Sequence, residues 1–195
     1  MENREMYFST EFKTRETDDK EKYLEGYFIM YNSETELQRG IYEEITPQAL
    51  TKSLADNDVR CLFNHDTSIV LGRTGNGTLE LRSDDKGLWG RVKVNPFDKQ
   101  ANDIYARIER GDINACSFGF IPVDEDIIHK DDGSVKFVVR EAELKEVSAV
   151  TFPAYPQTQV AARMETAEQD KKRMLNAKKS KLKERLKNGT KNNHA

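Results

Sequence analysis

Cys116 and Ser117 lie side by side in the stretch GDINACSFGF, residues 111–120, and both side chains can act as nucleophiles. The stretch predicts a strand, in which alternate side chains face opposite sides. Cys116 then shares a face with two phenylalanines, as a buried structural cysteine does. Ser117 shares the other face with alanine and glycine, where a substrate can approach closely. The pattern favours Ser117 over Cys116 as a nucleophile, and a serine that merely fits a packed strand is the alternative.

A serine hydroxyl needs a base that takes its proton, and histidine is the usual one because its pKa lies near neutral pH. The sequence contains His65, His129 and His194. His65 ends the apolar stretch DVRCLFNH, where a strand gives way to a loop and a side chain can be both held and accessible. His129 heads an apparent turn, where we expect it to be exposed, and His194 is nearly the last residue. His65 is therefore the candidate base, although a structural role is the alternative.

A third group should hold the imidazole ring and stabilise its charged form. Asp66 is a poor candidate, because neighbouring side chains on an extended chain point apart. Glu146 lies in the apolar stretch LKEVSAVTFPAYP, residues 144–156. Glutamate is rarely buried without a partner, which favours a role for Glu146. A strand at a sheet edge, with Glu146 facing water, fits the same pattern.

Metal and phosphate chemistry have little support in the sequence. The histidines and the two cysteines, Cys61 and Cys116, show neither paired metal-ligand spacing nor a disulfide framework. Residues 72–78, GRTGNGT, lack the Lys-Ser/Thr ending of a phosphate-binding loop and predict a hairpin turn instead. We therefore expect no metal and no cofactor.

We expect strands to position these side chains. Most of the chain consists of short segments with the alternation typical of strands, separated by glycine and aspartate residues that favour turns. The predicted strands lie within residues 6–14, 22–32, 58–65, 68–74, 77–83, 87–94 and 115–123, with one or two more within 134–152. A strand over 58–65 would place His65 on the face of Val59, Cys61 and Phe63.

Two helices are expected among the strands. The first lies within ITPQALTKSLADN, with Thr46 as its N-cap, Pro47 at its first position and an end near Ala55. The second lies within NPFDKQANDIYARIERGD, where apolar residues recur at helical spacing and Gly111 stops the helix.

The C-terminal part of the sequence differs from the rest. Of 31 basic and 34 acidic residues in the 195-residue chain, residues 171–191 hold ten basic and one acidic, leaving 21 and 33 elsewhere. This segment predicts a charged helix with one narrow apolar stripe of Leu175, Leu182 and Leu186, more stable against a partner than alone. We therefore expect one domain over residues 1–160 and a basic tail, helical or flexible, over 161–195.

Targeting signals are not expected. The N-terminal segment MENREMYFST lacks the apolar core of a signal peptide, and no run approaches the roughly 18 apolar residues of a membrane span. Isolated cysteines favour a reducing cytoplasm.

Three motifs, NHD at 64–66, CSFGF at 116–120 and LKEVSAVTFPAYP at 144–156, together resemble the prohead maturation proteases of tailed bacteriophages. These proteases are similar in fold to the herpesvirus assemblins. The resemblance covers about residues 5–160, and the segment E-V-S-x-V-T-x-P-A is its most distinctive part. It implies a mostly β fold with flanking helices, in which a closed or nearly closed barrel carries the active site and a charged helical tail follows.

The resemblance also implies a serine endopeptidase that works through an acyl-enzyme. His65 would be the general base, Ser117 the nucleophile and Glu146 the third member that orients His65. The herpesvirus proteins use a second histidine in that third place, where this sequence has none. Cys116 has no role in this scheme. A cysteine peptidase that uses Cys116 with His65 is an alternative, which strand alternation disfavours.

The biology that the resemblance implies is capsid maturation. The substrates would be segments of the major capsid protein and its scaffold, and the protease itself, cut inside the assembling procapsid in the host cytoplasm. The basic tail would dock on acidic scaffold or capsid segments, with nucleic-acid contact as a rival role, and relatives with the assemblin fold often dimerise. The alternative from another class is a non-catalytic assembly or scaffold-binding module with the same fold.

Overall fold

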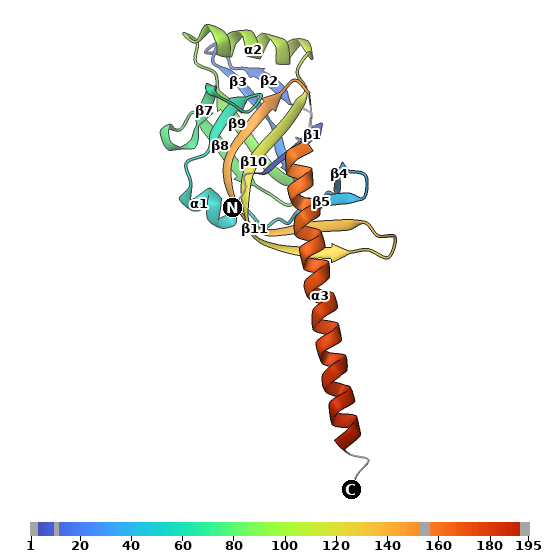
Figure 1. Ribbon diagram of the computed structural model, residues 1–195. Coiled ribbons are helices and arrows are strands. Elements are labelled where there is room, and N and C mark those ends of the chain that lie inside the picture. The colour runs from blue at the N-terminus through green and yellow to red at the C-terminus, as the bar shows by residue number, and fades with distance from the viewer. Residues whose placement is uncertain (1–3, 10–11, 153–156, 192–195) are drawn as a thin grey trace.

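The computed structural model describes residues 4–9, 12–152 and 157–191, and for residues 5, 7–9, 157–163 and 186–191 it describes the backbone alone. Eleven strands, three α-helices and one short 3-10 helix make up these residues (Figure 1). The strands are β1 (Arg4–Ser9), β2 (Lys13–Glu16), β3 (Lys22–Met30), β4 (Thr35–Gln38), β5 (Ile41–Ile45), β6 (Arg60–Phe63), β7 (Asp66–Arg73), β8 (Leu79–Ser83), β9 (Gly87–Lys93), β10 (Ala115–His129) and β11 (Val135–Val150). The helices are α1 (Thr51–Asp56), η1 (Thr74–Asn76), α2 (Lys99–Arg110) and α3 (Gln157–Lys191).

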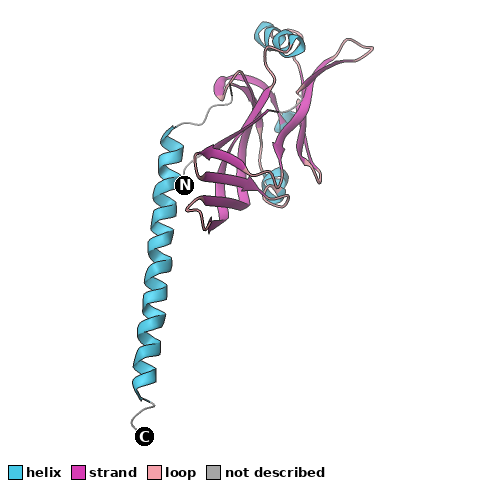
Figure 2. Ribbon diagram, turned by 90° about the vertical axis from the view of Figure 1, so that its right-hand side faces the viewer, coloured by secondary structure: helices cyan, strands magenta, loops and turns pink. Residues whose placement is uncertain are grey.

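The strands form two sheets. In the seven-stranded sheet the order is β1-β10-β11-β5-β4, and β6 pairs with both β11 and β7. In the four-stranded sheet the order is β2-β3-β9-β8. The mostly β class with a few helices is therefore confirmed (Figure 2). The strand pairings of the described residues form two open sheets and no closed barrel, so the barrel-like core is not confirmed.

Strand β11 is the centre of the seven-stranded sheet. It pairs along its length with β10 in antiparallel register, and its two halves pair in parallel with β5 and with β6. The sequence predicted one or two late strands, and the structure has one strand of 16 residues. Because β11 has neighbours on both sides, a polar side chain on it can be fixed by groups from β10 and from the end of β6.

Apolar side chains of both sheets meet in one large cluster. It includes the fully buried Phe28 of β3, Phe118 of β10 and Val147 of β11. Burial of such apolar surface is the main favourable contribution to folding, on the order of 25 cal/mol per Å². The candidate site lies on the other face of the seven-stranded sheet, away from this cluster.

Helix α2 matches its prediction. The Asp98 side chain caps it by accepting hydrogen bonds from the N–H groups of Gln100 and Ala101, and Gly111 ends it in the left-handed conformation with φ 88°. Its apolar stripe is buried, and the helix lies across one end of the molecule beside β2 and β3 (Figure 1). Local signals sufficed here because the apolar stripe and the stop at Gly111 both lie within the segment itself.

The expected N-cap at Thr46 is wrong. The Thr46 hydroxyl donates to the Val139 carbonyl of β11 (3.0 Å), so it does not cap a helix. Turns occupy residues 47–50, and α1 starts only at Thr51. A contact with a strand 93 residues away has therefore replaced the local capping signal.

Two further predictions about turns and strands need correction. Residues 72–78 do not close a hairpin, because β7 belongs to one sheet and β8 to the other, with η1 between them. The predicted strand over residues 6–14 is divided into β1 and β2, which lie in different sheets. A change of sheet is set by tertiary pairing, which alternation along the sequence does not encode.

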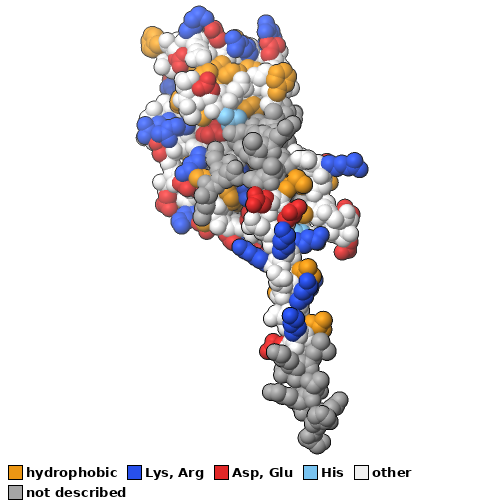
Figure 3. All heavy atoms as spheres, viewed as in Figure 1, with side chains coloured by type: hydrophobic (Ala, Val, Ile, Leu, Met, Phe, Trp, Pro, Cys, Tyr) orange, Lys and Arg blue, Asp and Glu red, His pale blue; other side chains and the backbone are white. Residues whose placement is uncertain are grey.

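The tail forms one long helix, α3, which projects away from the sheets (Figures 1 and 2). Ala167 packs with Leu37, Ile41 and Phe137 beneath the turn of the β10–β11 hairpin. Beyond that contact Leu182 is 60% exposed, and Figure 3 shows lysine and arginine side chains along the helix. The described part of the tail is thus helical, whereas the division into a domain over residues 1–160 and a tail over 161–195 stays a prediction. No helix among the described residues is long and apolar enough to span a membrane.

Candidate active site

The turn between β6 and β7 determines where His65 points. Asn64 and His65 both have left-handed backbone conformations, with φ 52° and 58°. Asparagine and histidine are among the non-glycine residues that adopt this conformation most readily. The two residues turn the chain after Phe63, so the expectation that His65 shares a face with Val59 and Cys61 is wrong. Cys61 pairs with Val147 on the core side of β11, whereas His65 reaches the opposite face.

Asn64 fastens this turn to the end of β11. Its backbone N–H donates to the Ala149 carbonyl (2.9 Å). Its side-chain Oδ1 accepts from the Thr151 N–H (2.8 Å), and its Nδ2 lies 3.3 Å from the Thr151 hydroxyl. The turn that carries His65 is therefore tied to the strand that carries Glu146.

Glu146 is the partner of His65. Its Oε1 lies 2.7 Å from His65 Nδ1, and its Oε2 accepts a hydrogen bond from the Ser148 hydroxyl (2.5 Å). The two side chains are 12% and 16% exposed, so water screens the pair weakly. Glu146 does not lie on an edge strand facing water, because β11 pairs with both β10 and β6 at this position.

Gly119 leaves space for the Glu146 carboxylate. The two residues are opposite each other in the β10–β11 ladder, and a Cβ atom on residue 119 would lie 2.6 Å from Glu146 Oε1. A side chain there would therefore displace the oxygen that contacts His65. Sequence reasoning counted Gly119 only as a small neighbour of Ser117 and did not consider Ser148. The i, i+2 spacing of Glu146 and Ser148 on a strand was the available signal.

Ser117 lies on the same face as Glu146. It is opposite Ser148 in the ladder, two residues from Gly119, and directly opposite residues project to the same side. Its side chain is fully buried, and its hydroxyl donates to the Met6 carbonyl of β1 (2.7 Å). The structure thus brings Ser117, Glu146 and His65 to one face of the sheet, with the hydroxyl proton directed at β1.

A comparison with protein families gives a separate finding about the whole chain. The family described as Caudovirus prohead serine protease matches residues 9–173 of the chain. The chain belongs to this family. The family resemblance noted in the three motifs is thereby confirmed.

The chain is also similar to two individual phage proteins. The prohead protease of Enterobacteria phage HK97 is 30% identical over 148 residues, which are 74% of this chain and 61% of that protein. The chain therefore spans about three fifths of the length of this relative. The solved capsid assembly protease of bacteriophage T4 is 16% identical with a TM-score of 0.50, and the match covers 78% of this chain and all of that one. At this identity the likeness concerns the fold alone.

The two cysteines of this prohead-protease family member lie on the core side of their strands. Cys61 and Cys116 are both fully buried and belong to the large apolar cluster. Burial raises the pKa of the Cys61 thiol well above its usual value, and the nearby Cys116 and Glu146 raise it further. A thiol in such surroundings is a poor nucleophile, because the thiolate is the reactive form.

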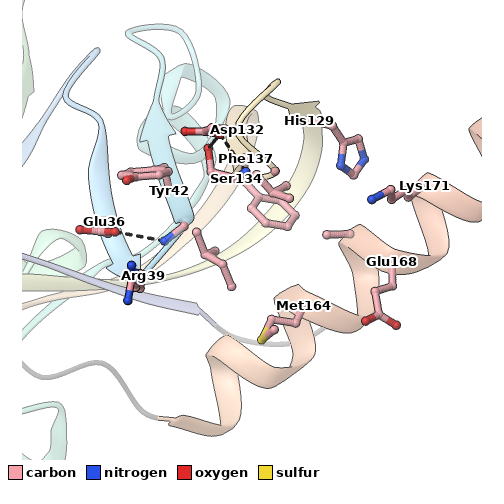
Figure 4. A pocket seen from close by; sticks show the side chains of 15 residues that line it. Glu36, Arg39, Tyr42, His129, Asp132, Ser134, Phe137, Met164, Glu168 and Lys171 are labelled. Carbon is pink, nitrogen blue, oxygen red and sulfur yellow. Dashed lines mark hydrogen bonds between the residues drawn. The ribbon is translucent and has the colours of Figure 1, made fainter.

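The remaining histidines lie elsewhere. His129 ends β10, and its Nε2 lies 3.1 Å from Asp170 Oδ2 on α3. It lies opposite the α3 side chains Glu168 and Lys171, at a pocket between the sheet and that helix (Figure 4). His129 is therefore less exposed than expected, since its side chain is 22% exposed. His194 lies outside the described residues.

Proposed function

We propose that this chain is a capsid maturation serine endopeptidase that cuts scaffold and capsid protein segments inside the procapsid. The observation that supports it most is the His65–Glu146 pair on the face of the sheet that carries Ser117. Membership of the prohead serine protease family fits the same activity. A histidine that bonds to a carboxylate and lies on the face of a serine is the arrangement of serine hydrolases.

Glu146 fixes which nitrogen of His65 acts as the base. The carboxylate accepts a hydrogen bond from the N–H at Nδ1, so the proton stays on Nδ1 and Nε2 has the lone pair. Nε2 takes the proton of the Ser117 hydroxyl as the oxygen attacks the scissile carbonyl, and then donates it to the leaving amine. Water hydrolyses the resulting ester by the same route in reverse. Glu146 stabilises the imidazolium that forms during each step.

Ser117 must reorient before it reacts. Its hydroxyl has one proton, which it donates to the Met6 carbonyl in this structure. Rotation about χ1 to another staggered rotamer directs the hydroxyl away from β1. Catalytic hydrogen bonds often form fully only when substrate is bound. The structure therefore corresponds to a resting state in this proposal.

The test is a time course of intact mass for the purified protein, beside Ser117→Ala and Cys116→Ala. The proposal expects the parent and Cys116→Ala to release fragments, while Ser117→Ala stays whole. If none of the three is cut, the assay is repeated with co-expressed capsid and scaffold protein. A parent that still leaves every chain intact there would be the non-catalytic assembly module. Loss of cleavage in Cys116→Ala alone would favour the cysteine peptidase.

The tail is proposed as the docking element for acidic segments of scaffold or capsid protein. The described side chains of residues 171–185 include eight lysines and arginines and one glutamate. Deletion of residues 166–195 is expected to abolish co-assembly with capsid protein. A milder variant changes Lys178, Lys179 and Lys181 to Glu, and its control changes them to Gln. Nuclease treatment during assembly separates this proposal from nucleic-acid contact, since only the latter loses binding.

A further inference from the structure

We propose that Ser148 and Asn64 are positioning residues that hold the His65–Glu146 pair in its reactive geometry. Their catalytic meaning rests on the proposed protease function, whereas their effect on the ring of His65 does not. Ser148 acts on the carboxylate of Glu146, and Asn64 acts on the backbone of His65. The pair is thus held from both ends.

Ser148 restricts the carboxylate of Glu146. The terminal torsion of a glutamate side chain is broad, so a carboxylate held by one oxygen can rotate. Here Ser148 donates to Oε2 while His65 Nδ1 lies at Oε1, which fixes both oxygens. Ser148 is fully buried, so water does not replace its hydroxyl when that group is removed. Its loss therefore releases the rotation of the carboxylate.

The backbone of β10 completes the restriction. Gly119 lies so close that a Cβ atom there would meet Glu146 Oε1 at 2.6 Å. The carboxylate thus lies between the β10 backbone on one side and the His65 ring on the other. Within this narrow space the Ser148 hydrogen bond selects the rotation that directs Oε1 at Nδ1.

Asn64 performs the corresponding role for the ring. A left-handed conformation is unfavourable for residues other than glycine and persists only when the surroundings enforce it. Two such residues follow each other at Asn64 and His65. The hydrogen bonds of Asn64 to Ala149 and Thr151 hold the two residues in this conformation. They set the direction in which the His65 side chain leaves the turn.

A matched set of serine variants tests the Ser148 half. Ser148→Ala removes the hydroxyl, and Ser148→Thr keeps it. Ser68→Ala is the control, because Ser68 also donates to a carboxylate two residues away, Asp66, at 2.6 Å but on the exposed surface. We expect Ser148→Ala to lower kcat about 10- to 100-fold at unchanged KM, as small misplacements of reacting groups do. Ser148→Thr should restore most of the loss, and Ser68→Ala should match the parent.

The readout that does not need protease activity is the ¹⁵N spectrum of the His65 imidazole. The parent should show the tautomer protonated at Nδ1, and Ser148→Ala a mixture of both tautomers. Ser148→Thr and Ser68→Ala should resemble the parent. An unchanged tautomer in Ser148→Ala would overturn the proposal even if activity fell, because Ser148 would then act in another way, for example as a nucleophile. If no chain cleaves anything, the protease function fails while the spectrum still decides the positioning role.

Asn64 is tested by variants that separate its backbone from its side chain. Asn64→Gly tolerates the left-handed conformation but loses the side-chain bonds to Thr151. Asn64→Asp keeps the oxygen that accepts from the Thr151 N–H. We expect a loss of about tenfold in kcat for Asn64→Gly and a smaller one for Asn64→Asp, with a matching shift in the His65 spectrum. If Asn64→Gly has the kcat and spectrum of the parent, Asn64 has no positioning role.

Discussion

Among the described residues, two histidine–carboxylate pairs lie toward the two ends of the long β10–β11 hairpin, and they differ in what surrounds them. In the first, His65 Nδ1 lies 2.7 Å from Glu146, and the side chains are 16% and 12% exposed. In the second, His129 Nε2 lies 3.1 Å from Asp170, and the side chains are 22% and 30% exposed. Distance and residue type hardly separate the two pairs.

Their surroundings do separate them. The carboxylate of Glu146 has a second hydrogen bond from Ser148, and the strand beside it carries Ser117 on the same face. Asp170 belongs to the tail helix, which packs on the sheet through the small apolar cluster around Ala167. The His65–Glu146 pair is therefore the candidate for catalysis, because a second hydrogen bond holds its carboxylate and a serine lies on the same face. The His129–Asp170 pair connects the tail helix to the sheet.

The largest expected effect contrasts the same substitution in the two pairs. Glu146→Gln keeps the size of the side chain, but its amide can present an N–H to His65 and favour the wrong tautomer. By analogy with the serine protease triad, we expect kcat to fall about 10³- to 10⁴-fold. Asp170→Asn should change kcat less than about twofold, since no catalytic role is assigned to the His129 pair. The measurement is cleavage of a capsid or scaffold segment at saturating substrate.

Thermal unfolding of both variants is the accompanying control. Folded Glu146→Gln with full activity would remove Glu146 from the mechanism and leave the two pairs equivalent. A large loss in Asp170→Asn would instead assign the tail helix a direct part in catalysis.

A smaller effect is expected from Gly119→Ala. The new Cβ would lie 2.6 Å from Glu146 Oε1, which is the end of a flexible side chain, so the carboxylate moves and the fold tolerates the change. We expect kcat to fall about 10- to 100-fold while the melting temperature stays nearly constant.

Gly90→Ala is the matched control for that variant. Its Cβ would lie 2.6 Å from the ring of Phe28, a fully buried core residue. Overpacking of this kind costs about 1–3 kcal/mol of stability, and activity per folded molecule should remain. The reverse outcome, with Gly119→Ala unstable and fully active, would contradict the arrangement of Gly119 and Glu146.

The sequence allowed some parts of the site to be predicted because the signals were local. Alternation along one strand was enough to place Cys116 with the phenylalanines and Ser117 on the other face, and both placements are confirmed. Helix α2 was predictable for the same reason, since its cap at Asp98 and its stop at Gly111 lie within its own segment.

Other parts depend on contacts between distant segments. His65 and Glu146 are 81 residues apart. They meet because β6 pairs in parallel with β11, and no local sequence pattern predicts that pairing. The face of His65 was predicted wrongly, because two left-handed residues in succession need the Thr151 contact that stabilises them. Only the resemblance of the three motifs linked these residues in advance.

A still smaller effect is expected at the second pair. His129→Ala removes the bond to Asp170, and partly exposed pairs of this type contribute up to about 1 kcal/mol. Amide hydrogen exchange in the first half of α3 should therefore rise by no more than about fivefold, with cleavage rates unchanged. His65→Ala serves as the comparison, since it should abolish cleavage and leave exchange in α3 as it was. An increase well beyond fivefold would show that His129 anchors the tail more strongly than its geometry indicates.

The last prediction is that the two thiols, Cys61 and Cys116, do not react with an alkylating reagent in the folded protein. Cys61 and Cys116 are fully buried, so reagents in solution do not reach them, and burial also raises the pKa of the Cys61 thiol, which disfavours its reactive thiolate form. Iodoacetamide should therefore label neither residue in the folded protein and both in urea, as mass spectrometry can measure. Ser117, the proposed nucleophile, and Cys116 are neighbours in sequence but belong to opposite faces of β10, one on the face of the His65–Glu146 pair and one in the core. Rapid labelling of Cys116 with loss of activity would reverse that assignment, because it requires the thiol to lie outside the apolar core.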